Sequence, residues 1–450
     1  MAMPNPGRVL AAMTPGGRAR VPAAWALYDF ANTIFSYAVV SVAIGLWLTD
    51  DTRFGQATGQ LVQGLAVAAS VGLNGLISPV LGAMSDRGGR RLPFLLFFTV
   101  LTILPTALIG ASPALVGAAL FAIANFGYQA ALIYYDATLS VVSTPAARGR
   151  LSGTGVAVGY MGTIFVGLFF LATGIRAPEA MFLVSAVLFA IFATPIFLVV
   201  RETPTGGEQF RLRDVPAVIG QLGRTLADSG MVPGLRRFLI GRFFYSDAVN
   251  TIIVVMSVVA VRGMGFTTGE FLLISLGLTV VAIGASFVWG GLVDRFGPRR
   301  TLVWVLASWA VGLVLGAAAL SLPGTLPGVV LFLVAGGILG SGLGGVQVAD
   351  RVFMLRLSPR RQIGEFFGLY GLVGKASQVI GQILYSVIVF LLVDRIGNGA
   401  YQLAVLSLLG TMLVGLWLIW PVSDRWGSAT TDDLLDAAVP PVGSGVAPAG

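Results

Sequence analysis

The chain has 450 residues, of which 56% are hydrophobic and only 11% are charged. A soluble protein carries about 25% charged residues, so this composition excludes a soluble globular protein and predicts one that crosses a lipid bilayer repeatedly. The net charge is +8, but the basic residues are spread over the connections between apolar runs, whereas nucleic-acid-binding proteins concentrate them on one face or tail. Nucleic acid is therefore not an expected partner.

The apolar runs divide the chain into twelve predicted spanning helices, since each run approaches the roughly 20 residues that a bilayer requires. After a cytoplasmic N-terminal segment at 1–23, the helices are predicted at 24–49, 58–84, 92–111, 113–142, 151–173, 180–200, 236–262, 268–292, 301–321, 326–356, 363–392 and 400–420. The charged stretch 201–235 is the predicted cytoplasmic linker between an N-terminal bundle, 24–200, and a C-terminal bundle, 236–420. The cytoplasmic tail, 421–450, is rich in Ser, Thr, Asp, Pro and Gly and is predicted to be disordered.

Arginine indicates the orientation of these helices. When the loops are assigned alternately to the two sides, one side carries only Arg53, Arg176, Arg262 and Arg395, while the other 23 arginines lie on or just inside the opposite side. The positive-inside rule then places both termini in the cytoplasm. We therefore expect a multi-pass protein of a bacterial inner (plasma) membrane.

Three acidic markers recur in both halves of the chain, in the same order. The matched pairs are Asp29 and Asp247 in the first and seventh helices, Asp86 and Asp294 after the second and eighth, and Asp136 and Asp350 near the ends of the fourth and tenth. The partners are 218, 208 and 214 positions apart. A nearly constant offset indicates a duplicated six-helix unit, and two such parallel halves place a substrate site near mid-membrane between them.

The motifs around these markers resemble those of a known superfamily. The segment Gly82 to Arg91 resembles the loop signature of the major facilitator superfamily, and Gly290 to Arg300 resembles its degenerate copy. The segments Trp25 to Asn32 and Tyr245 to Thr251 are similar to motifs of the narrower "unknown major facilitator" group, which includes the fungal vacuolar amino-acid effluxers. The Arg-centred helix-four motif of many proton antiporters is absent, which is a departure from that part of the superfamily.

The resemblance implies an all-α membrane protein with twelve transmembrane helices in two pseudo-symmetric six-helix bundles. It implies that helices one, four, seven and ten line the cavity, while three, six, nine and twelve face lipid. It also implies a conformational gate in the two repeated loops, at Asp86, Arg87, Arg90, Asp294 and Arg295. We expect Asp136, Asp350 and Arg351 to belong to the same gate, because they lie within two turns of the cytoplasmic helix ends.

Lys375 is the only lysine in the chain and lies about twelve residues into the predicted eleventh helix, which is about 18 Å deep at about 1.5 Å per residue. A charge near the bilayer centre costs roughly 2.5–3.5 kcal/mol and normally faces a cavity or a partner. Gln378 and Gln382 follow on the same face of the helix. Contact with substrate or a proton is one interpretation, and internal pairing for packing is the other.

Other polar residues form stripes on apolar helices. Asp29 and Asn32 share a face of the first helix, Asp247 and Asn250 repeat them in the seventh, and Asn125 and Gln129 share a face of the fourth. For Asp29 and Asp247 a proton site or an amine ligand is expected, and a structural hydrogen bond or helix cap is the alternative.

No nucleotide-binding motif, cofactor motif or catalytic constellation is found, and the chain has neither Cys nor His. We therefore expect no enzyme activity, no cofactor and no metal site. The predicted function is secondary transport of a small solute, with amino-acid efflux as the favoured case, by rocker-switch alternating access coupled to protons, in a monomer. One cation with nearby carboxylates suits an amphoteric solute. The alternatives are a proton-linked carrier of sugars, drugs or organic anions, and a lipid scramblase or flippase-like protein on the same scaffold.

Overall fold

The computed structural model describes residues 20–88, 91–142, 148–202, 220, 234–357 and 363–423. Within these ranges every regular element is a helix. Eleven segments are long and apolar enough to cross a membrane, and the remaining one, α7, has a shorter apolar part, Ala157–Thr173. The predicted twelve-helix pattern is therefore confirmed.

The N-terminal half contains six membrane-crossing paths. The first is continuous over α2 (Arg20–Ile34), the π-helix η1 (Phe35–Ala43) and α3 (Ile44–Leu48), and the others are α4 (Gly55–Gly88), α5 (Leu92–Ile109), α6 (Ala114–Val142), α7 (Arg148–Thr173) and α8 (Pro178–Val199). In the C-terminal half the paths are α10 (Leu235–Val258) continued by η3 (Val259–Gly263), α11 (Thr268–Phe296), α12 (Pro298–Ala319), α13 (Leu326–Leu357), α14 (Ile363–Ile396) and α15 (Asn398–Ile419). Several helices run a turn beyond their predicted ends. The reason is that a helix can continue past the apolar run once its polar residues reach the interface, as α11 does through Asp294 and Arg295.

Local sequence explains where α11 begins and ends. Thr267 accepts a hydrogen bond from the backbone of Glu270 at 3.2 Å, and the Glu270 carboxylate accepts one from the backbone of Thr267 at 2.7 Å. This reciprocal pair is a capping box, which satisfies two of the amide groups that a helix start leaves unpaired. At the other end Gly297 has φ +85°, a backbone conformation that favours glycine, and Pro298 begins α12 directly after it.

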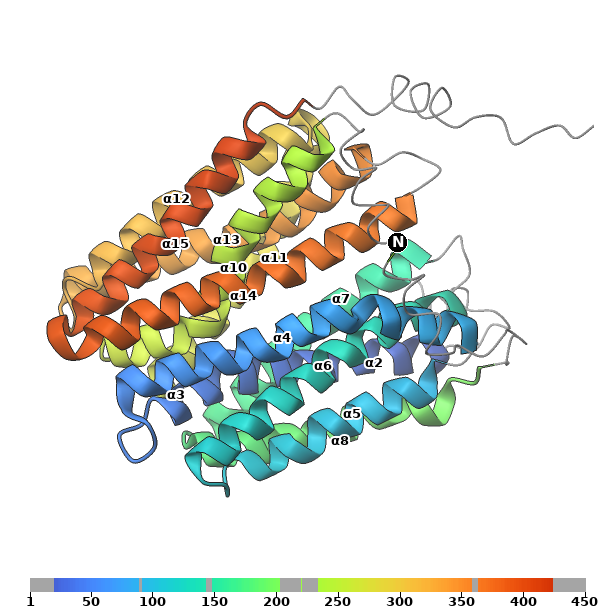
Figure 1. The fold of residues 1–450 in the computed structure, drawn as a ribbon, viewed down its shortest axis with the longest axis horizontal. Coiled ribbons are helices and arrows are strands. Elements are labelled where there is room, and N and C mark those ends of the chain that lie inside the picture. Colours follow the sequence, from blue (N-terminus) through green and yellow to red (C-terminus); the bar gives the residue numbers. More distant parts are fainter. Residues whose placement is uncertain are drawn as a thin grey trace, which may run out of the picture.

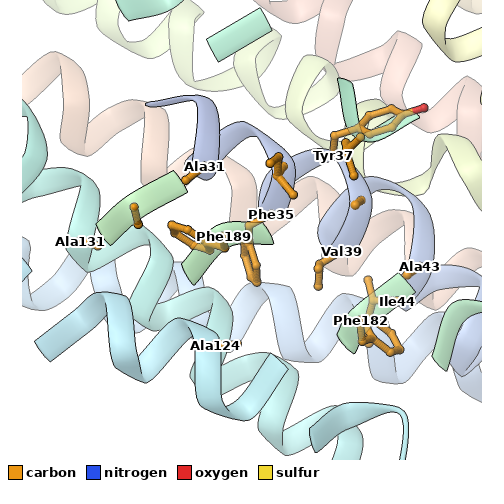
Figure 2. Close-up of a cluster of buried hydrophobic side chains, with 14 of the residues drawn as sticks. Ala31, Phe35, Tyr37, Val39, Ala43, Ile44, Ala124, Ala131, Phe182 and Phe189 are labelled. Carbon is orange, nitrogen blue, oxygen red and sulfur yellow. The ribbon is translucent and has the colours of Figure 1, made fainter. Parts of the chain in front are cut away.

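The helices form two bundles that lie side by side (Figure 1). Helices α2 to α8 enclose one apolar core and helices α10 to α15 enclose the other. In the N-terminal core the ring centres of Phe35 of η1 and Phe189 of α8 are 6.2 Å apart. Tyr37 of the same π-helix points away from these two rings (Figure 2). The bundles meet mainly where α4 runs along α14, where α7 contacts α11 and where η1 and α3 contact α10.

One set of hydrogen bonds joins the two bundles at the helix ends on one side of the molecule. We call the side where α2 begins and α8 ends the terminal side, and its opposite the far side. On the far side Arg262 donates to Thr49 at 3.4 Å and to the carbonyl of Leu46 at 3.5 Å. There Tyr401 also donates to Gln56 at 3.1 Å. Among the described residues, these hydrogen bonds therefore join the two bundles to each other on the far side.

The division into N-terminal segment, linker and tail stays a prediction. Residues 1–19, 203–219, 221–233 and 424–450 lie outside the described residues.

Candidate functional site

A cavity of about 450 Å³ lies between the two bundles. It is lined by parts of α2, η1, α6 and α7 on one side and of α10, η3 and α11 to α15 on the other. The resemblance had implied helices one, four, seven and ten as its walls, and these are present. The fifth, eighth, ninth, eleventh and twelfth helices also contribute. Trp309 and Leu313 of the ninth, α12, and Val405 of the twelfth, α15, line the cavity, which corrects the expectation that these two helices face lipid.

The two bundles give the cavity different walls. The N-terminal bundle supplies mostly hydroxyl and amide groups, from Thr33, Ser36, Tyr37, Ser41, Asn125, Tyr128, Gln129, Tyr160 and Thr163. The C-terminal bundle supplies mostly aliphatic and aromatic groups, with Asn250, Ser275, Thr279, Gln347 and Gln378 as its polar members. Among the described lining residues none is charged. The cavity is thus amphipathic, and its polar groups can bind by hydrogen bonds alone.

Four of the predicted binding residues line this cavity: Asn125, Gln129, Asn250 and Gln378. Asn125 is held in place by a hydrogen bond that its amide donates to Ser70 of α4, at 2.8 Å. Asn32 and Gln382 are instead buried, with 2% and 1% of their surface exposed, and neither lines the cavity. Residues that share a polar stripe in the sequence therefore have different surroundings, because some of them line the cavity and others are buried away from it.

Lys375 lies beside the cavity, on the seam between α4 and α14. Its Nζ donates to Oδ1 of Asn74 at 2.8 Å, across the two bundles. It also interacts electrostatically with Asp136 of α6. Because Gln378, one turn further along α14, does line the cavity, the lysine lies at the rim on the terminal side.

The paired aspartates Asp29 and Asp247 have matching surroundings. A Cβ placed on Gly159 of α7 would lie 2.7 Å from Oδ2 of Asp29, and a Cβ on Gly381 of α14 would collide with both oxygens of Asp247. Each carboxylate therefore packs against a glycine of the fifth helix in its own bundle. Sequence reasoning missed these two glycines, since a glycine in a chain that contains 60 of them gives no signal.

Asp136 and Asp350 match in sequence but differ in environment. Asp136 is exposed on the terminal side, where Lys375 and Arg351 of the other bundle are its electrostatic partners. Asp350 is 2% exposed and forms an ion pair with Arg242 of α10. The guanidinium of Arg242 also stacks 3.5 Å from the ring centre of Tyr370.

Sequence reasoning missed Arg242. The available signal was an arginine inside the apolar stretch predicted at 236–262, a position that requires a partner in the membrane.

The loop residues of the predicted gate are only partly described. Asp294 and Arg295 are exposed at the terminal-side end of α11, and Arg295 lies 5.1 Å from the ring of Phe296. Asp86 and Arg87 belong to the last turn of α4, but their side chains lie outside the described part, as does all of Arg90. Their gating role stays a prediction.

The far side carries a second set of charges, at the helix ends. Asp50 lies 3.5 Å from Arg262. Hydrogen bonds from Thr52 lower the pKa of Asp50, and the charge of Arg262 adds to the effect. The carboxylate is therefore ionised at neutral pH, opposite the guanidinium that ties α3 to η3.

Comparisons with known proteins agree with this architecture. Residues 61–431 match the family described as vacuole effluxer Atg22 like. The chain is 25% identical over 417 residues to the uncharacterized MFS-type transporter YxiO of Bacillus subtilis (strain 168), a match that covers 88% of this chain and 93% of the relative.

Two solved structures share the fold. A mutant form of the nucleoside transporter NupG superposes with a TM-score of 0.70 at 13% identity, over 89% of this chain and 99% of that one. A D-xylose-proton symporter gives the same TM-score, 0.70, at 13% identity, over 91% and 99% of the two chains.

Proposed function

The chain belongs to the Atg22-like family of vacuole effluxers, within the major facilitator transporters, and on that premise we propose that it exports a small amphoteric solute, an amino acid in particular. Transporters of this fold are not enzymes, and they move solutes across the membrane. Alternating access, proton coupling and a monomeric working unit are parts of the same proposal. So is a bacterial inner membrane as the location, with both termini in the cytoplasm.

The observation that carries the proposal is the amphipathic cavity between the bundles. A small solute that bears both polar groups and an apolar part can place the first against Asn125, Gln129 and their neighbours, and the second against the C-terminal wall. Mostly apolar pockets with a few well-placed polar groups are typical of small-molecule sites. The nucleoside and xylose transporters share only the fold at 13% identity, so they do not favour their own solutes here.

Charges at the rim support an amphoteric solute. Lys375 can attract a carboxylate, and Asp29 and Asp136 can attract an ammonium group, while the cavity itself remains neutral. With the termini in the cytoplasm, the terminal-side rim faces the cytoplasm, and the far side, where hydrogen bonds join the bundles at the helix ends, faces away from it. An exported solute would then enter past the rim and bind above it.

The proposal is tested with purified protein in liposomes and a panel of labelled amino acids, with and without a pH gradient. Lys375→Ala should reduce transport of the accepted amino acid about 10-fold or more, because it removes the rim cation that attracts the solute's carboxylate as the solute enters, and about 1.4 kcal/mol of lost attraction is tenfold in affinity. Arg395→Ala, an exposed residue on the far side, is the control and should transport normally. The amphoteric-solute proposal fails if no amino acid is exchanged and Lys375→Ala changes no flux.

A further inference from the structure

Asp247 lies outside the cavity, although Asn250, in the next turn of α10, lines it. Its side chain is 1% exposed. It turns instead toward α14 and α15, where the backbone of Gly381 and the side chain of Thr411 face it. A solute in the cavity does not touch this carboxylate. If Asp247 binds a ligand, that ligand is therefore not the transported solute.

The contacts of Asp247 leave one oxygen without a donor. Oδ1 accepts a hydrogen bond from the backbone N–H of Gly381. Oδ2 has no hydrogen-bond partner among the described residues. The hydroxyl of Thr411 lies within hydrogen-bond distance of the carbonyl of Leu408, at 3.0 Å, and also faces the Asp247 carboxyl.

The elements packed against α10 supply no counter-charge. In the part of the chain that the structure describes, the charged and titratable side chains on α10 and on these elements are Arg236, Arg237, Arg242 and Tyr245 on α10 itself, Asp350, Arg351 and Arg356 on α13, Tyr370, Lys375, Tyr385, Asp394 and Arg395 on α14, Tyr37 on η1, Arg262 on η3 and Tyr401 on α15.

Each cation of this set is engaged elsewhere or lies at the surface. Arg242 pairs with Asp350, Lys375 binds Asn74 and Arg262 pairs with Asp50. The remaining arginines are exposed at the helix ends, namely Arg236, Arg237, Arg351, Arg356 and Arg395. None of these described cations is bonded to Asp247.

A buried ionised carboxylate without a counter-charge is so costly that the group takes up a proton instead. The close approach of Gly381 leaves little space beside the oxygens for a larger cation and its ligands. We propose that Asp247 is the proton-binding site of the transporter, held between α10, α14 and α15 and separate from the solute cavity. This rests on the proposed function in one respect, that transport is driven by protons.

Asp29, the counterpart of Asp247 in the N-terminal bundle, has different surroundings. This difference fits a proton site at Asp247 that is separate from the solute cavity. It packs on Gly159 in the same manner, but it is half-buried and has Asp136 as an electrostatic neighbour at the rim. The copy in the N-terminal bundle thus faces the entrance, and the copy in the C-terminal bundle is enclosed. Loading and unloading of Asp247 require α10 to move against α14 at the Gly381 contact, where no side chain obstructs sliding.

Infrared difference spectroscopy tests the site without a solute. We expect purified wild-type protein in nanodiscs at neutral pH to show the C=O stretching band of a protonated carboxyl group, unchanged by added sodium chloride. Asp247→Asn, which keeps an oxygen for the Gly381 amide, should lose the component of this band that belongs to Asp247, seen in the difference between the wild-type and variant spectra. Thr411→Val should shift it, and Asp394→Asn, at the exposed far end of α14, should leave it intact.

Loss of a band component in Asp247→Asn, together with its shift in Thr411→Val, supports the site. A band that persists unchanged in Asp247→Asn overturns it, and so does a band that disappears when sodium is added, because the site would then hold a metal cation. In liposomes Asp247→Asn should abolish accumulation driven by a pH gradient and retain exchange of solute. If wild-type protein moves no solute at all, the proposed function fails while the spectroscopic result still decides the proton site.

Discussion

Cysteines at positions 45 and 258 should stop transport when they are oxidised and permit it when they are reduced. Gly45 of α3 and Val258 of α10 meet on the far side, where a Cβ on Gly45 would lie 2.7 Å from Cγ2 of Val258. The Cβ atoms of a disulfide are about 3.5–4.5 Å apart, and the Cβ of residue 258 is one bond from Cγ2, so the two positions can be joined with little movement. Because the bond fixes the bundles together on the far side, the cavity cannot open there, and flux should fall to that of empty liposomes.

The chain contains no native cysteine, so the two introduced thiols are the only ones that can form a disulfide within it. The double variant serves as its own control before and after a reductant, and the single variants Gly45→Cys and Val258→Cys should not respond to oxidant. Complete cross-linking, confirmed by mass spectrometry, with flux equal to that of the reduced protein would show that the far side does not need to open.

Arg242→Met should destabilise the protein by about 3–5 kcal/mol, the usual cost of removing one partner of a buried ion pair. The arginine pairs with Asp350, lies 3.4 Å from the hydroxyl of Ser246 and stacks on Tyr370. Its loss leaves the Asp350 carboxylate buried without a counter-charge between α10, α13 and α14. The free energy of unfolding, measured by SDS titration in mixed micelles, is the quantity to compare.

The double variant Arg242→Met and Asp350→Leu separates charge from packing. Replacing both members of a buried pair by apolar residues is often neutral or stabilising, so the double variant should be more stable than Arg242→Met alone. If Arg242→Met unfolds like the wild type, or if the double variant is no more stable than the single one, the ion pair is not what joins these helices.

The architecture was predictable because its signals are local. An apolar run of sufficient length must be a helix in a bilayer, where each backbone group has to be satisfied within its own segment. The arginine bias and the repeated aspartates are also read directly from the chain. Asn125 and Asn250 were singled out by the same local reasoning, since each lies on a polar stripe of an inner helix, and both line the cavity, while their role in binding stays a prediction.

The surroundings of the aspartates were not predictable, because their partners are distant in sequence. Arg242 and Asp350 are separated by 108 positions, and Asp247 and Gly381 by 134. Asp247 and Asn250 are only one turn apart, yet one faces α14 and the other faces the cavity. A stripe on a helix specifies which residues share a face, and only the packing of the bundle determines what that face meets.

Counterflow in liposomes tests alternating access through one shared cavity most directly. Vesicles are loaded with an excess of the unlabelled amino acid found in the panel, and entry of the labelled form is followed at equal pH on both sides. A carrier should accumulate label transiently above its equilibrium level, because each outward passage returns the cavity to face the label, and the oxidised 45–258 double-cysteine protein should not. Label that enters at the same rate in loaded and unloaded vesicles would contradict alternating access.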